Sequence, residues 1–115
     1  MVRIYREKIL KTTELTGAAL DWAVAKCEKP DWLGNQAEVY VLKAGFHPST
    51  DWAQGGPIIE LECIDLEWTG IPNADFFCTI QGKYEAHGNT PLIAAMRCYV
   101  ASKLGDEIEL PGVLL

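Results

Sequence analysis

The chain has 115 residues, 49% of them hydrophobic, and its 16 acidic against 10 basic side chains give a formal charge of -6. A chain of this length and apolar content builds one core, so we expect a single small domain over residues 1–115 and exclude wholesale disorder. The acidic balance argues against a protein that binds duplex nucleic acid, because such binding needs clustered Lys and Arg. The opening residues alternate charged and apolar side chains, and no run of about 18 apolar residues occurs. We therefore expect neither export nor a membrane span.

The negative charge is concentrated in the second half of the chain. Residues 1–57 carry seven basic and seven acidic groups, whereas residues 58–115 carry three basic and nine acidic ones. A solvated acidic sheet face and tail would account for this division. A surface that binds a cation or a partner is the alternative.

The four cysteines, Cys27, Cys63, Cys78 and Cys98, are widely separated and include no C-x-x-C pair. Zinc sites use closely spaced ligands, and the chain has only two histidines to help. Each cysteine also sits among apolar neighbours, which predicts buried, reduced thiols. A disulfide or a metal site is the alternative. We expect no cofactor.

The first part of the chain predicts a short strand followed by a helix. Residues 3–11 give the strand, so that residues 1–12 form an N-terminal extension or strand. A threonine cap, an acid in the first turn and apolar side chains at helical spacing then predict a helix from Thr12 onward. This helix should end near Glu28, because the residue before Pro30 is pushed out of helical geometry.

The middle of the chain predicts strands separated by turns and one long loop. Residues 37–43 are rich in β-branched and aromatic side chains, and residues 59–63 alternate between apolar and acidic ones, so both segments predict strands. Between them, residues 44–57 are dense in turn-forming residues and predict a long loop, a place where function often lies. A further strand over residues 76–84 should follow a turn at residues 69–73.

The last third carries the clearest element. Asn89 and Thr90 supply a cap, Pro91 suits a first turn, and Gly105 marks an end, which together predict a helix over residues 92–104. Its sequence is apolar around most of its circumference, so the helix should be nearly buried. A short terminal strand over residues 106–111 completes the prediction.

Together these elements predict an α+β domain in which a mostly antiparallel sheet packs against two main helices. Four tryptophans and a nearly all-apolar helix give this small chain more apolar surface than one thin sheet covers. We therefore expect a homodimer or a higher homo-oligomer.

Three blocks of sequence together resemble the NinX family of small bacteriophage proteins. They read TELTGAALDWAVAK at residues 13–26, STDWAQGGPIIE at 49–60 and TPLIAAMRCYVASKLGDE at 90–107. The likeness spans most of residues 13–107 and is weakest over 61–89. The sequence has Leu61-Glu62-Cys63 where the family more often carries a basic residue. The resemblance implies a phage-encoded protein of the host cell cytoplasm, from a family of unassigned function.

The long loop supplies the first group of candidate ligand-binding residues. Its polar side chains offer hydrogen-bond groups, its glycines allow close backbone approach, and its tryptophan offers a flat face for a base. These residues are Ser49, Thr50, Asp51, Trp52, Gln54, Gly55 and Gly56. The structural alternative is a tight Gly-Gly turn whose tryptophan packs into the core and whose aspartate caps the next element.

The start of the last predicted helix supplies the second group. Asn89 and Thr90 lead into free backbone N–H groups at the positive end of the helix dipole, an arrangement that binds phosphate or carboxylate. If the loop lies beside this helix end, Trp52 would hold the ring of a nucleotide and Thr90 its phosphate.

Arg97 is the third candidate, because it lies on an otherwise apolar stripe of the same helix. A buried guanidinium demands a partner. We expect either an internal pair with an acid such as Asp51 or Glu60, or a contact with a ligand phosphate or a partner chain.

Signals for catalysis are thin. The sequence has no nucleophile elbow, P-loop, H-E-x-x-H or dinucleotide-binding motif. His47 and Asp51 could form a base and its orienting acid, but four residues apart in a loop they are weak support for one. We therefore expect no enzyme, no catalytic residue and no metal.

The expected function is that of a non-catalytic phage protein that binds and sequesters a small nucleotide-type ligand. A host anti-phage immune signal, such as a cyclic nucleotide or an ADP-ribose derivative, is the expected ligand by analogy with other small phage proteins. Two alternatives stay open. One is an accessory protein that acts by protein–protein interaction with a host or phage factor, and the other is a hydrolase of such a nucleotide.

Overall fold

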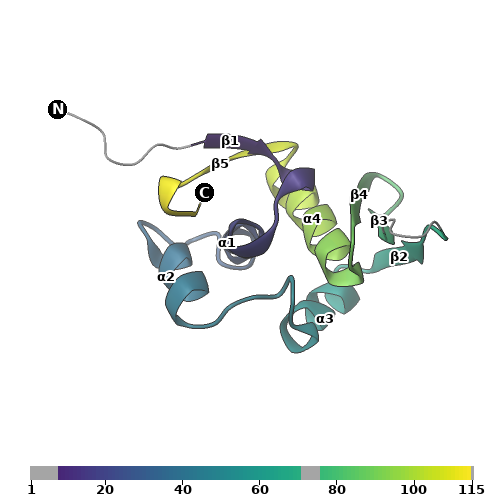
Figure 1. The fold of residues 1–115 in the computed structure, drawn as a ribbon, viewed down its shortest axis with the longest axis horizontal. Helices are drawn as coiled ribbons and strands as arrows, with labels where there is room; N and C mark the ends of the chain where they lie inside the picture. The colour runs from purple at the N-terminus through teal and green to yellow at the C-terminus, as the bar shows by residue number, and fades with distance from the viewer. Residues whose placement is uncertain (1–7, 71–75, 115) are drawn as a thin grey trace.

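The computed structural model describes residues 8–70 and 76–114 and has an α+β fold with antiparallel sheets, as predicted (Figure 1). The elements in chain order are β1 (Lys8–Lys11), a 3-10 turn η1 (Thr12–Glu14), α1 (Gly17–Glu28), α2 (Gln36–Lys43), α3 (Trp52–Leu61), β2 (Ile64–Trp68), β3 (Phe76–Ile80), β4 (Tyr84–Gly88), α4 (Pro91–Leu104), β5 (Glu107–Leu110) and a second 3-10 turn η2 (Gly112–Leu114). In the described part of the chain, no helix is both long and apolar enough to cross a membrane.

The strands form two separate antiparallel sheets. Strands β2, β3 and β4 make a three-stranded meander, in which Cys78 at the centre of β3 lies opposite Leu66 and Ala86. Strands β1 and β5 form a two-stranded ribbon that joins the two ends of the chain, with Lys11 opposite Glu107. The predicted strand at residues 106–111 is therefore confirmed, and the described part of the one at residues 3–11 pairs with it.

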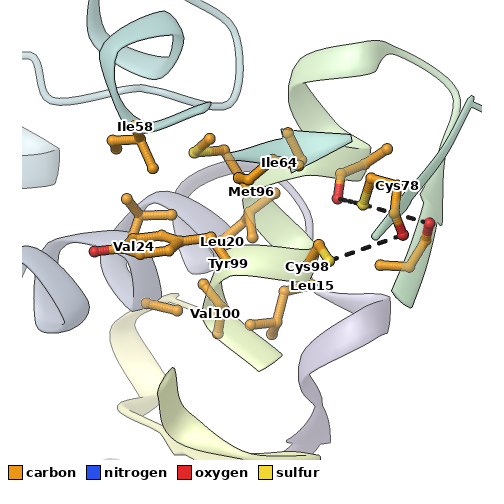
Figure 2. Close-up of a cluster of buried hydrophobic side chains, with 14 of the residues drawn as sticks. Leu15, Leu20, Val24, Ile58, Ile64, Cys78, Met96, Cys98, Tyr99 and Val100 are labelled. Carbon is orange, nitrogen blue, oxygen red and sulfur yellow. Dashed lines mark hydrogen bonds between the residues drawn. The ribbon is translucent and has the colours of Figure 1, made fainter. Parts of the chain in front are cut away.

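Helix α4 lies at the centre of the molecule. The sheet β2–β4 packs on one side of it, α1 lies on another, and α3 meets its N-terminal end (Figure 1). Eight of its 14 residues are buried: Leu92, Ala94, Ala95, Met96, Cys98, Tyr99, Val100 and Ala101. Figure 2 shows Met96, Cys98, Tyr99 and Val100 within the hydrophobic core. The predicted boundaries hold, because Thr90 caps the helix and Gly105, with a φ of 88°, ends it. The prediction of a nearly buried helix is confirmed.

Residues 37–43 were expected to form a strand and instead form α2. The β-rich composition favoured a strand, but the helix places Ala37, Tyr40 and Val41 on one face at i, i+3 and i+4, where they join the core against α1. The Trp22 Nε1–H also donates a hydrogen bond to Glu38 Oε1 across the α1–α2 contact. Tertiary packing has thus overridden the local preference.

The expected loop over 44–57 and strand over 59–63 are also wrong in part, because α3 runs from Trp52 to Leu61. Two glycines and Pro57 inside the helix hid it from pattern analysis. Asp51 starts the helix by accepting the Ala53 N–H at 2.9 Å. The strand begins only at Ile64, after Cys63 takes a φ of 53° and turns the chain.

The strand expected over residues 76–84 is divided into the hairpin β3–β4. Gln81 and Gly82 both have positive φ, 55° and 67°, which is the backbone of a tight hairpin turn. The pair Gln81-Gly82 was the signal for this turn in the sequence. Of the turn expected at residues 69–73, residues 71–73 lie outside the described residues.

The cysteines are all free, as predicted, but they are not all buried. Cys78 and Cys98 lie in the core between β3 and α4, where the Cys78 thiol donates to the Ala94 carbonyl at 2.8 Å (Figure 2). Cys27 is half-buried, and burial raises the pKa of its thiol to about 12. Cys63 is exposed, because it sits in the turn between α3 and β2 rather than in a strand. Within the described residues, no group of His, Cys, Asp and Glu could hold a metal ion.

The close approach of β4 to α4 at Gly88 leads to the first prediction. A Cβ atom at Gly88 would lie 2.5 Å from the Ala94 nitrogen and 2.9 Å from Ile93 Cγ2, so the strand could not stay against the helix. We expect Gly88→Ala to lower the free energy of unfolding by about 1–3 kcal/mol in urea denaturation. Glu85→Ala, on the exposed face of the same strand, should change it by less than about 0.5 kcal/mol. Equal stability of the two variants would contradict this packing.

Candidate functional site

A cavity of about 230 Å³ lies between the start of α3 and the start of α4. The lining residues come from both segments that the sequence singled out: Ser49, Thr50, Trp52, Thr90, Pro91, Leu92 and Ile93. The structure thus brings the Trp52 loop and the N-terminus of α4 together. A broader hollow at the β1–β5 ribbon is lined by Lys11, Thr13, Asp106 and Glu107. All four are exposed, so this hollow is open surface.

Both helices begin at the cavity. The α4 cap is the Thr90 hydroxyl oxygen, which accepts the Ile93 N–H at 3.1 Å, and the α3 cap is the Asp51 carboxylate. The amides of Trp52 and Leu92 lie in the first turns, where no carbonyl precedes them in the helix. The partial positive charges of two helix N-termini therefore meet at one place.

Gly55 fixes how closely the two helices approach. A Cβ atom there would lie 2.5 Å from the Pro48 carbonyl oxygen and 2.6 Å from Leu92 Cδ2. Gly55 thus makes room for the first turn of α4, and neither Gly55 nor Gly56 lines the cavity. At Gly56 an added Cβ atom would meet only the Trp52 ring, at 3.9 Å. The expectation that these glycines admit a ligand to the backbone is not supported by their position.

Trp52 is 55% exposed, so the alternative in which it packs into the core is wrong. Its ring forms one wall of the cavity, while Pro91, Leu92 and Ile93 provide apolar surface from the α4 side. Thr50 also lines the cavity and is exposed, with its hydroxyl 3.4 Å from the His47 carbonyl oxygen. An exposed indole beside an apolar hollow can stack on a planar ring.

Ser49 is the buried polar residue of this site, with 2% of its surface exposed. Its backbone N–H donates to Asp21 Oδ1 at 2.9 Å. Its hydroxyl lies beside the same carboxyl, yet within the described residues it has no hydrogen-bond partner of normal geometry. The hydroxyl oxygen is enclosed by protein, and the group with which it interacts is the Asp21 carboxyl.

Asp21 supports this side of the cavity by accepting the Ser49 N–H, a role that the sequence did not predict. It lies in α1 and is 4% exposed, and burial raises the pKa of its carboxyl, an effect that the hydrogen bonds of Ser49 and the charge of His47 oppose only in part. The available signal was an acid in the otherwise apolar run from Leu20 to Ala25. Such an acid must have a partner inside the fold.

Three other candidates do not line the cavity. Gln54 Oε1 accepts the His47 N–H at 2.6 Å and its Nε2 donates to the Gly45 carbonyl at 3.0 Å, so the side chain braces the preceding loop. Asp51 caps α3, as the structural alternative predicted, and meets His47 through its backbone N–H rather than through a side-chain pair. Asn89 precedes the α4 cap and is exposed.

Arg97 does not line the cavity. Its Nε donates to the Leu15 carbonyl at 2.7 Å and its Nη1 to the His87 carbonyl at 2.9 Å. The expected internal partner was an acid such as Asp51 or Glu60, but among the described residues neither forms an ion pair with it. Arg97 donates instead to backbone carbonyls near the end of β4 and between η1 and α1.

The two adjacent glycines of α3 give a matched prediction. Gly55→Ala should lower the free energy of unfolding by about 1–3 kcal/mol, because α3 must move away from Pro48 and Leu92. Gly56→Ala should leave it unchanged or raise it by up to about 1 kcal/mol, because alanine favours a helix and meets nothing closely. Thermal and urea unfolding measure both, and a stable Gly55→Ala protein would rule out the close approach.

Asp21 gives a prediction about pH. Its pKa is raised on folding, so the stability that the group contributes is full below its unfolded pKa of about 3.9 and is lost as the pH rises through the folded value. Asp21→Asn keeps an oxygen for the Ser49 N–H without a buried charge, and should be at least as stable as the natural protein at pH 7. That advantage should shrink toward pH 4.

Asp21→Ala is the control, because it leaves the Ser49 N–H without its acceptor. It should lower the free energy of unfolding by about 1–3 kcal/mol. Urea denaturation at several pH values measures all three proteins. An Asn variant that is less stable than the natural protein at pH 7 would show that the charged carboxylate is the favoured form.

Comparison with known proteins adds one finding. No curated protein is significantly similar to the chain. The family described as "Bacteriophage P22, NinX" matches residues 11–103, which include α1, α3 and nearly all of α4 as well as every residue that lines the cavity. The match covers most of the sequence, and the chain therefore belongs to the NinX family of bacteriophage proteins.

Proposed function

We propose that this phage protein binds and sequesters a small nucleotide-type ligand in the cavity between α3 and α4. The observation that carries the proposal is that an exposed tryptophan and the N-terminus of a long helix line the same cavity. The indole of Trp52 offers a stacking face for a base, which is worth about 1–3 kcal/mol per base. At the N-terminus of α4 the Leu92 amide offers a hydrogen bond to an anionic group, because Pro91 has no N–H and Thr90 accepts the N–H groups of Ile93 and Ala94.

The size of the cavity limits what it can enclose. At about 230 Å³ it is smaller than the roughly 300–1,000 Å³ of pockets that bury a whole drug-sized ligand. It would therefore enclose a base and the group next to it, while the remainder of the ligand would lie on the surface. Such a site suits capture of a signalling nucleotide in the host cytoplasm, with a host anti-phage immune signal as the expected ligand.

Sequestration fits the contacts better than hydrolysis does. A hydrolase that attacks with a serine needs a base to activate the hydroxyl, and in the described part of the chain the Ser49 hydroxyl lies beside a carboxyl with no histidine bonded to it. The thiols of Cys78 and Cys98 lie in the core, away from the cavity. We therefore propose that the protein releases the ligand chemically unchanged.

A second function, docking on a host or phage protein, is favoured by a different surface. Leu33, Val39 and Leu42 are 80%, 44% and 52% exposed on α2 and the segment before it. Exposed apolar groups of this kind mark protein interaction sites, and they would equally serve the predicted homo-oligomer. Light scattering at micromolar concentration and capture experiments with host lysate separate these uses from ligand binding.

The proposed function predicts calorimetric binding of at least one member of a panel of cyclic mononucleotides, cyclic dinucleotides and ADP-ribose derivatives. Trp52→Ala should weaken that binding about 10- to 100-fold, because the stacking face is lost. Trp68→Ala is the matched control, since Trp68 is 66% exposed but lies at the end of β2, away from the cavity. It should bind as the natural protein does.

Failure of the whole panel to bind would refute the proposal. Denaturing the complex and identifying the released ligand by mass spectrometry tests the second part, because a sequestering protein returns the ligand intact. Recovery of a cleaved product would favour the hydrolase instead.

A further inference from the structure

Two of the four thiols lie beside each other in the core, where the proposed function does not use them. Cys78 is at the centre of β3 and Cys98 in the middle of α4, and neither has any exposed surface. Their thiol groups are within hydrogen-bonding reach of each other, between the sheet and the helix (Figure 2). The fold thus brings together two oxidisable groups that are 20 residues apart in the chain.

We propose that Cys78 and Cys98 are a redox pair, which closes to a disulfide between β3 and α4 when a peroxide reaches it through an opening of β4. In a reducing cytoplasm the pair stays as two thiols, because disulfides that form there are transient and serve catalysis or redox sensing. Oxidation ties the sheet to the central helix. The proposal does not depend on the ligand proposed for the cavity.

Strand β4 controls access to the pair. The Cys98 thiol donates to the Tyr84 carbonyl at 3.3 Å, and the Cys78 sulfur lies 3.5 Å from the Ala86 carbonyl oxygen. Both carbonyls belong to β4, which in the described part of the chain pairs with β3 alone and so forms an edge of the sheet. Such elements open locally at a lower free energy than the whole protein unfolds. Movement of β4 away from α4 would uncover both thiols together.

The reaction balances with hydrogen peroxide as the oxidant. One thiol attacks a peroxide oxygen, the O–O bond breaks, water leaves and the sulfur becomes a sulfenic acid. The second thiol attacks that sulfur, the S–S bond forms and a second water leaves. Two electrons pass from the two sulfur atoms to the peroxide. A thiol reductant reverses the change by thiol–disulfide exchange.

The test uses a Cys27→Ser, Cys63→Ser parent, in which only the buried pair remains. After reaction with hydrogen peroxide in the folded state, mass spectrometry should show the loss of two hydrogen atoms, and dithiothreitol should restore the mass. Cys98→Ser in this parent should not show that loss. The disulfide should raise the midpoint of thermal unfolding by about 5 °C or more, because it restricts the unfolded chain.

Two glycine variants of the parent test the route through β4. Gly88→Ala pushes β4 away from α4, so the disulfide should form about tenfold faster or more, in proportion to the larger open population. Gly55→Ala is the matched control, because it also weakens a close contact of α4 but at α3. It should react at the parent rate.

Urea below the unfolding transition tests the same route in the parent, even where a glycine variant does not fold. The rate of disulfide formation should rise only weakly with urea, because opening β4 exposes little surface. A rate that rises as steeply as global unfolding, or equal acceleration by the two glycine variants, would overturn the proposal. So would a disulfide that lowers the midpoint of thermal unfolding, or a folded parent that forms none.

Discussion

Helix α4 has apolar side chains on nearly every face, so it can be stable only when other elements cover it from several directions. The sheet β2–β4, the helix α1 and the first turn of α3 each cover part of it (Figure 1). This requirement also creates the candidate site. Covering the N-terminal end of α4 brings α3 so close that position 55 must be glycine, and the two helices then begin side by side around one cavity.

The sequence predicted the elements whose signals are local. Thr90 and Gly105 marked the two ends of α4, and apolar spacing predicted α1, although α1 begins at Gly17 and not near Thr12, where the chain forms the 3-10 turn η1. Helices α2 and α3 were missed because their stability comes from contacts that no local pattern contains. Helix α2 depends on packing against α1, and α3 depends on the cap at Asp51 and on space made by Gly55. Long-range contact, rather than propensity, decided both.

For the candidate site, the sequence located the two segments but misassigned several residues within them. Trp52 and Thr90 were singled out as separate candidates whose adjacency the sequence could not show, and both line one cavity in the structure. Gln54, Gly55 and Arg97 were expected to face a ligand, yet they brace a loop, admit a helix and satisfy backbone carbonyls. A polar or small residue can either contact a ligand or support the fold. Only its neighbours in the folded structure show which of the two roles it has.

The net charge of -6 makes the protein as a whole unfavourable for an anion, so binding of one would depend on the groups around the cavity. An anion there must be held by amides and hydroxyls against two nearby carboxyl groups. The most direct test is a ¹⁵N NMR titration of the protein with cyclic AMP or cyclic GMP, which reports every backbone amide and the Trp52 indole at once. The account predicts the largest shifts at Ser49, Trp52 and Leu92. Shifts confined to the β1–β5 ribbon around Lys11 and Asp106, or none with either nucleotide, would contradict it.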